Sequence, residues 1–178
     1  IISREDASDA IITSAARQIK QACWENLAVN LTFTLSDVVE EPVTLWERYS
    51  RLRSQSLYHL VLSNKTLVTE EMVRQLKKSD DMQTALKIED DILEKLHLSS
   101  SILEIWLQKL FWELGHLNYD SIVYVVTRMQ RKLIHKLEAA PRPTAEGRKL
   151  PEMLGSDSFK NLSLDKIQRI IWDQICVV

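Results

Sequence analysis

The chain of 178 residues holds 23 Lys and Arg against 25 Asp and Glu, which gives a formal net charge of −2 at pH 7. It therefore lacks the overall positive charge that attracts nucleic acids or acidic lipids. Three glycines and four prolines are too few for the closely spaced turns of a β-sandwich or barrel, and no apolar run reaches the roughly 18–20 residues of a membrane span. This composition favours an all-α fold with a sizeable core.

The first part of the chain predicts helices separated by polar turns. Apolar residues recur at helical spacing over about residues 4–28, and residues 30–34 are richer in β-forming side chains. Thr44-Leu45-Trp46-Glu47 matches a capping box, in which the Thr hydroxyl and the Glu carboxylate accept hydrogen bonds from free amides of the first turn. We expect the helix that starts there to end near residues 63–64.

Further helices are predicted in the middle of the chain. Thr69 is expected to cap a helix over residues 70–78, and apolar spacing predicts another over about residues 80–98. A second capping box, Ser101-Ile102-Leu103-Glu104, opens the next helix. Gly115 is the residue expected just beyond its C-terminal end.

Residues 119–139 carry apolar side chains at intervals of three and four. The beginning of this segment, residues 122–126, is rich enough in β-branched residues to resemble a strand. Because the helical register continues well past it, we predict a helix throughout.

The clearest linker is the segment 141–147, which contains two prolines. After it, a last helix is predicted from about residue 164 to the end. We therefore expect a single irregular helical bundle of about six or seven helices. It divides into a helical core in residues 1–140, a linker with a short helical turn in 141–157, and a C-terminal segment, 158–178, whose helix packs back on the bundle.

No common catalytic motif is present: the chain lacks a glycine-rich phosphate loop, a G-x-S-x-G turn, an H-E-x-x-H helix and a C-x-x-C pair. Glu113 and His116 have the E-x-x-H spacing of di-iron carboxylate bundles, but the second such pair that those sites need is missing. We expect no enzyme activity, no cofactor and no metal site. The acidic residues, which lack the pattern of a calcium loop, are expected on exposed helical faces: Glu89, Asp90, Asp91 and Glu94, with Asp80 and Asp81 upstream.

One face of the helix over residues 119–139 is basic. The residues lie at i, i+3, i+4, i+7 and i+8: Arg128, Arg131, Lys132, His135 and Lys136. Such a face is either simply solvated or is a surface for an anionic partner, such as phosphates, acidic lipid or an acidic protein segment. No aromatic side chains are interleaved for base stacking, and both interpretations stay open.

The segment from Ile102 to Leu114 is apolar nearly all round, with four polar residues among thirteen. A helix of this kind is either buried on every side or presents its outer face to a partner. The candidate partner-binding residues are Ile105, Trp106, Phe111 and Trp112. Of these, Trp106 is expected in the core, so that Trp106→Ala would cost roughly 3–5 kcal/mol, and Trp112 is expected at the outer face.

Together these features predict a non-catalytic helical protein-protein interaction domain, a fragment of a larger intracellular (cytoplasmic or nuclear) scaffold or multisubunit complex. Its partner would be another protein or a second copy of itself, with no small-molecule substrate. One alternative is a secreted, cytokine-like helical-bundle ligand, which three N-x-S/T sequons and the pair Cys23 and Cys176 suggest. The other is a nucleic-acid-associated helical domain that uses the basic face.

Overall fold

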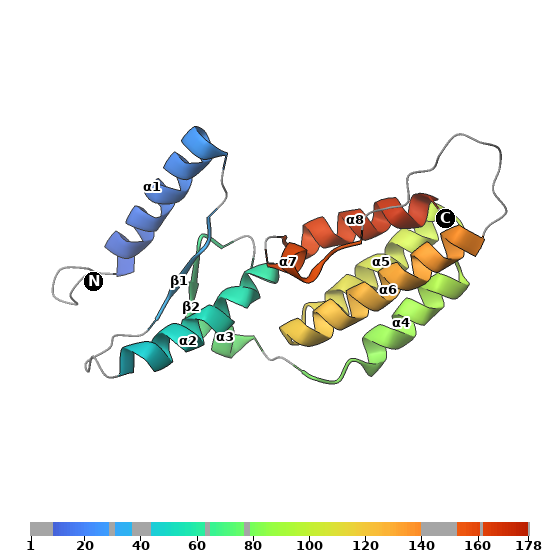
Figure 1. Ribbon diagram of the computed structural model, residues 1–178, viewed down its shortest axis with the longest axis horizontal. Coiled ribbons are helices and arrows are strands. Elements are labelled where there is room, and N and C mark those ends of the chain that lie inside the picture. Colours follow the sequence, from blue (N-terminus) through green and yellow to red (C-terminus); the bar gives the residue numbers. More distant parts are fainter. Residues whose placement is uncertain are drawn as a thin grey trace. The chain divides into compact units, whose positions relative to one another are not determined.

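The computed structural model (Figure 1) confirms the all-α fold, because 76% of the residues that it describes are helical. The described residues are 9–28, 31–36, 44–62, 65–76, 79–139, 153–160 and 162–177. Contacts divide the chain into two units, Ile1–Leu76 and Lys77–Val178, and each is described by itself below. The division expected from the sequence falls elsewhere, at a linker whose residues 141–147 lie outside the described part of the chain.

The first unit combines helices with a small parallel sheet. Its elements are α1 (Asp9–Leu27), β1 (Phe33–Leu35), α2 (Leu45–Ser56), the 3-10 helix η2 (Leu57–Leu60), β2 (Leu67–Thr69) and α3 (Glu70–Gln75). Strand β1 pairs with β2 in register Phe33 to Leu67, and α2 packs against β1. Leu60 and Val68 are buried in this unit. The sheet was not predicted, although residues 30–34 carry its β-forming side chains.

Buried charge also ties this unit together. The carboxylate of Glu70 at the start of α3 is almost fully buried and receives two guanidinium groups. Nη1 of Arg48 in α2 lies 3.4 Å from its Oε2, and Nη2 of Arg74 lies 3.2 Å from the same oxygen. A buried carboxylate needs such partners because its desolvation is costly. The side of α2 that carries Arg48 is thereby committed to contacts within the unit.

The second unit is a ring of four helices that run side by side (Figure 1). They are α4 (Gln83–Glu94), α5 (Ser100–Leu114), α6 (Tyr119–Ala139) and α8 (Leu164–Val177), with the short α7 (Ser156–Phe159) before the last. Helix α4 contacts α5 and α6, and α8 contacts the same two helices from the other side. The predicted helix over residues 119–139 is confirmed, including residues 122–126. Apolar side chains from all four helices fill the centre, among them Ile92, Leu107, Leu110, Ile122, Leu133, Ile167 and Ile171.

A buried amide pair links two helices of this ring to the segment before α7. Gln130 of α6, fully buried, donates from Nε2 to Oε1 of Gln174 in α8 at 3.2 Å. Oε1 of Gln130 accepts a hydrogen bond from the backbone N of Leu154, also at 3.2 Å. Buried polar groups are costly when unsatisfied, so Gln130 holds residue 154 beside α6 and α8.

The ends of α5 differ from the sequence prediction. The residue preceding the helix is Ser99 in extended conformation (φ −61°, ψ 148°), so Ser101 lies inside the first turn and does not cap it. Gly115 follows the helix in right-handed conformation (φ −59°, ψ −17°) rather than in the left-handed conformation of a glycine cap.

Other predicted helix ends have mixed outcomes. The predicted cap at Thr69 is confirmed, because its Oγ1 accepts a hydrogen bond from the backbone N of Met72 at 3.3 Å. Thr44 also precedes its helix, but in helical conformation (φ −85°, ψ −3°) rather than the extended one of a capping box. Ala28, which follows α1, has a φ of 53°, in the left-handed region that glycine adopts most easily.

Candidate functional site

The outer face of α5 is the first candidate site. Its inner face packs in the ring through Leu103, Leu107, Leu110 and Leu114, which are all buried. On the opposite side, Ile105 and Trp112 are each 65% exposed, seven residues apart and hence on one stripe of the helix. Ile102 is also exposed, one turn before Ile105. Two of the four predicted partner-binding residues therefore lie together on the surface.

Phe111 and Trp106 occupy different positions from those two. Phe111 is only 5% exposed and belongs to the core, so it is unavailable to a partner in the folded chain. The expectation that Trp106 is a core residue is wrong: it is half-buried, with Nζ of Lys95 and Nζ of Lys109 at 4.2 Å and 5.4 Å from its ring centroid. Ammonium groups over an indole ring stabilise modestly, and these two lysines cover part of the Trp106 ring.

The ring of Trp112 is held in place by its neighbour one turn on. The ring centroids of Trp112 and His116 lie 4.4 Å apart at an interplanar angle of 55°. Nδ1 of His116 lies 2.8 Å from the carbonyl oxygen of Trp112, which fixes the imidazole against the end of α5. An exposed aromatic side chain with restricted rotation loses less entropy on binding than a free one.

The basic face of α6 divides into a half that pairs with α4 and a half that faces solvent. Arg128 donates from Nη1 to Oε2 of Glu89 and from Nη2 to Oδ1 of Asp90 at 3.1 Å. Nζ of Lys132 donates to Oδ1 of Asp90 at 2.5 Å and lies 3.3 Å from Oε1 of Glu89. Glu89 is 0% exposed, so its predicted place on an exposed helical face is wrong. Sequence periodicity missed this because the side chain that neutralises Glu89 lies 39 residues away.

Burial and pairing act in opposite directions on these two carboxyl groups. Desolvation raises the pKa of Glu89 above its ordinary value, although Arg128 and Lys132 both act to lower it. The hydrogen bond from Lys132 lowers the pKa of Asp90. The pKa of Arg128 is raised by both carboxylates, against the effect of its own desolvation. The cluster is therefore an inter-helix ion-pair network between α4 and α6.

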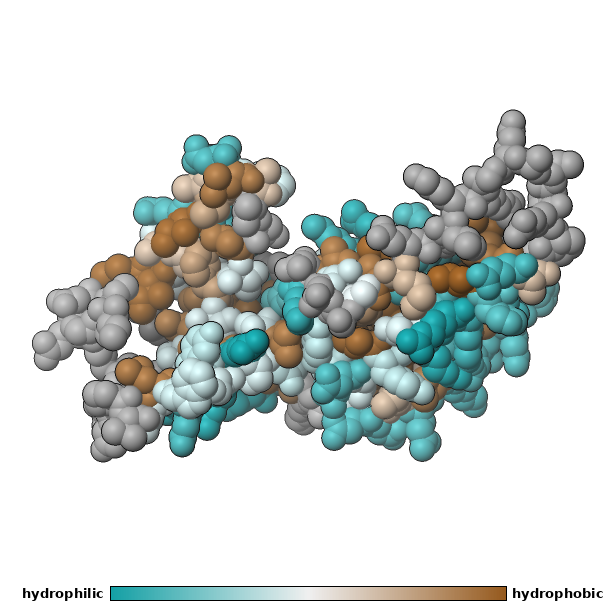
Figure 2. All heavy atoms as spheres, viewed as in Figure 1, coloured by the Kyte–Doolittle hydropathy of each residue, from teal (hydrophilic) through white to brown (hydrophobic). Residues whose placement is uncertain are grey.

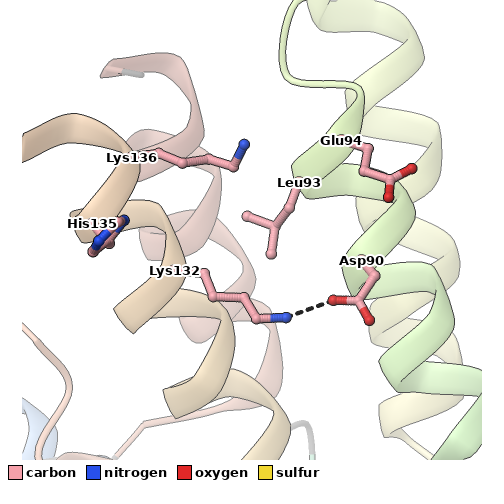
Figure 3. A pocket seen from close by; sticks show the side chains of 6 residues that line it. All are labelled: Asp90, Leu93, Glu94, Lys132, His135 and Lys136. Carbon is pink, nitrogen blue, oxygen red and sulfur yellow. Dashed lines mark hydrogen bonds and ion pairs between the residues drawn. The ribbon is translucent and has the colours of Figure 1, made fainter. Parts of the chain in front are cut away.

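Beside this network lies a shallow hollow between α4 and α6, of about 360 Å³ (Figure 3). Its lining mixes both signs of charge around one leucine: Asp90, Leu93, Glu94, Lys132, His135 and Lys136. Lys136 extends from α6 toward α4, whereas Lys132 is drawn to Asp90 (Figure 3). Arg131, the remaining residue of the predicted face, is exposed. The hollow holds no concentrated positive charge, because Asp90 and Glu94 line it together with its three basic side chains, and Lys132 is paired with Asp90.

Metal-binding side chains are not brought together anywhere in the described parts of the chain. Glu113 is half-buried and His116 exposed at the end of α5, where the ring nitrogen of His116 contacts backbone instead. Cys23 and Cys176 are both free. Among the described helices, none is both long and apolar enough to cross a membrane.

Exposed apolar side chains also gather in the first unit. Figure 2 shows hydrophobic residues along α1, where Ile11, Ile19, Trp24 and Leu27 are exposed. From the sequence this helix was predicted to be amphipathic, and none of these four residues was named as a partner-binding candidate. On α2, Trp46 and Tyr49 are exposed.

Comparison with known proteins adds no relative. No protein-family model matches the chain, and no curated protein and no solved structure matches it either.

Proposed function

We propose that this chain is a non-catalytic helical interaction domain, and that the outer face of α5 binds another protein or a second copy of the chain. The observation that carries the proposal is the pair Ile105 and Trp112. Both are 65% exposed on a helix whose other side is fully packed. Large apolar side chains on one exposed stripe are typical of interfaces, and tryptophan is the residue most enriched at their energetic centre.

The packing of α5 supports a partner-binding surface rather than a core contact that the folded unit leaves uncovered. Helix α5 already contacts α4 and α8, and its buried residues form a continuous inner face. No folding requirement therefore explains why Ile105 and Trp112 are apolar. Scaffold proteins and subunits of complexes carry surfaces of this kind. The proposed intracellular location rests only on that proposed role.

Fewer charges of the basic face are available to bind nucleic acid than its sequence suggested. Arg128 and Lys132 are occupied by Glu89 and Asp90, so they are poorly placed to neutralise phosphates. Arg131, His135 and Lys136 remain exposed. Three side chains beside Glu94 are a weak electrostatic surface in a chain with net charge −2.

The experiment is site-specific photocrosslinking in the source cell, followed by a binding assay with the captured protein. A photoreactive phenylalanine at position 112 should form a discrete adduct, whereas the same residue at Arg131, equally exposed on α6, should not. Trp112→Ala should then weaken binding of the captured protein at least tenfold, as for an interface anchor, with a loss of stability below about 1 kcal/mol.

Trp106→Ala provides the matched control. Since Trp106 is half-buried under two lysines, its removal should cost about 1–2 kcal/mol rather than a core value, and it should leave binding nearly unchanged. Thermal melts and sedimentation separate the two effects. Equal adducts at positions 112 and 131, or equal binding by wild type and Trp112→Ala, would refute the α5 surface.

A further inference from the structure

We propose that the outer face of α2, in the first unit, binds an acidic amphipathic protein segment through Trp46, Tyr49 and Arg53. This is a second surface, distinct from α5 and carried by different residues in the other unit. Its occupant is a helical segment that places a carboxylate within one turn of large apolar side chains.

The three side chains form one exposed line along the helix. Trp46 is 74% exposed and Tyr49 56%, and their ring centroids lie 5.8 Å apart at an interplanar angle of 32°. Arg53 is exposed and follows Tyr49 by four residues and Trp46 by seven, so it continues the same face. Leu45 is exposed beside Trp46.

The other side chains of α2 indicate that Trp46, Tyr49 and Arg53 do not belong to the core of the unit. Gln55 is buried and Leu52 half-buried, on the side where α2 packs against β1. Arg48 is committed to the buried Glu70. The helix thus has a packed side and an aromatic side, and the aromatic side is the one that remains exposed.

Charge on this face points to an acidic occupant. Two guanidinium groups of α2, Arg51 and Arg53, are exposed, and no ion pair involves either of them among the described residues. Glu47, roughly a quarter-turn from Trp46, is the one acidic residue of α2. The aromatic pair can bind apolar side chains of a partner segment, and the unpaired arginine that follows can bind a carboxylate beside them, since arginine forms bidentate bonds with carboxylates.

A helical protein segment fits better than a single-stranded nucleic acid. Tryptophan, tyrosine and arginine are the side chains most enriched at the centres of protein interfaces, and an amphipathic helix presents anchors at i, i+3 and i+4 to such a surface. Nucleic acids also stack on aromatic rings, but they need a track of several cations along the backbone. Here Arg53 alone lies in line with the rings, and Arg48 is occupied.

The test uses the full chain as bait for a displayed library of helical peptides. Peptides selected on the wild type should carry Asp or Glu within one turn of aromatic or aliphatic anchors. Selection on Arg53→Glu should replace that acid by Lys or Arg at the same position, which a nonspecific apolar surface would not do. Trp46→Ala should weaken the wild-type peptides at least tenfold. Positions 46 and 53 are both exposed, and far-UV circular dichroism would check that each variant folds.

Two controls keep this result separate from the α5 proposal. Trp112→Ala should bind the selected peptides like wild type, so failure of one surface leaves the other standing. Arg131→Glu, a charge reversal in the other unit, should leave the consensus unchanged. The proposal is overturned if no enriched peptide depends on Trp46, if the charge preference does not invert, or if oligouridylate displaces the peptides at physiological salt.

Discussion

Replacing Arg128 by methionine is the most decisive test of how the second unit is held together. Methionine keeps much of the apolar stem and removes the guanidinium that donates to Glu89 and Asp90. The carboxylate of Glu89 would then stay fully buried with Lys132 as its remaining cation. Nζ of Lys132 lies 3.3 Å from Oε1 of Glu89, yet that oxygen receives no hydrogen bond.

The expected cost follows from that geometry. Removing one partner of a buried ion pair typically costs about 3–5 kcal/mol, because the other charge is left uncompensated. We expect the low end, about 3 kcal/mol, since Lys132 remains and the raised pKa of Glu89 lets the carboxyl take up a proton. With a urea m-value of about 2 kcal/mol/M, the midpoint of unfolding should fall by roughly 1.5 M. The loss should shrink as the pH is lowered, because protonation of Glu89 removes the unpaired charge.

Arg131→Met is the matched control on the same helix. Arg131 is exposed, and its replacement should cost less than about 0.5 kcal/mol. In a double-mutant cycle, Arg128→Met should cost clearly less when Glu89 is already glutamine. If Arg128→Met and Arg131→Met unfold at the same urea concentration, the buried network does not stabilise the unit and the reasoning fails.

Four further predictions concern single side chains. Gln130→Ala should lower the free energy of unfolding by about 2 kcal/mol in urea titrations, because it leaves the amide of Gln174 and the backbone N of Leu154 without their present partner in a buried site. Ala28→Gly should raise the melting temperature, by a gain of up to about 1 kcal/mol, since glycine adopts the φ of 53° without strain; a lower melting temperature would contradict this. Because the folded-state pKa of Asp90 is lowered, its carboxylate stabilises the fold above its unfolded pKa, and this stability is lost as the pH falls through the lowered folded value. Asp90→Asn should therefore flatten the acid side of a plot of the free energy of unfolding against pH. The raised pKa of Glu89 works in the opposite direction, so Glu89→Gln should gain stability relative to wild type as the pH rises from the unfolded pKa of Glu89 to its raised folded value, and the gain should level off above it.

Long periodic segments were the part of the fold that sequence reasoning predicted well. The helix over residues 119–139 has the bounds expected for it, because six turns of regular apolar spacing outweigh the β-branched residues at its start. Thr69 was recognised as a cap because its hydroxyl acts within its own turn. Both are local features, and local features are what a single sequence displays most directly.

Apart from the helix ends at Thr44, Ser101 and Gly115, the errors depend on residues distant in the chain. From the sequence, Glu89 is predicted to be a surface acid, because nothing local indicates that Arg128 and Lys132 of another helix pair with it. Trp106 reads as a core residue on apolar spacing alone, and its real neighbours include a lysine from the end of α4. The strands β1 and β2 are three residues each and pair across the whole of α2, so the β-forming side chains of residues 30–34 alone could not predict the sheet. On α5, sequence reasoning found the stripe of Ile105 and Trp112 but could not separate it from the buried Phe111.

Just before α4, the backbone of Ser79 is bound to the turn between α5 and α6. Its N donates to the carbonyl oxygen of His116 at 2.9 Å, and its carbonyl oxygen accepts from the N of Asn118 at 3.1 Å. The side-chain amide of Asn118 also donates to Asp80. These hydrogen bonds join the segment before α4 to the turn after α5. At the other end of this helix pair, the short connection Lys95–Ser99 links the C-terminus of α4 to the N-terminus of α5. The segment that leads into α4 is therefore held against the turn that carries His116. Local unfolding of α4 should begin at its C-terminal end, near Lys95, and the α5 surface should stay formed while it does.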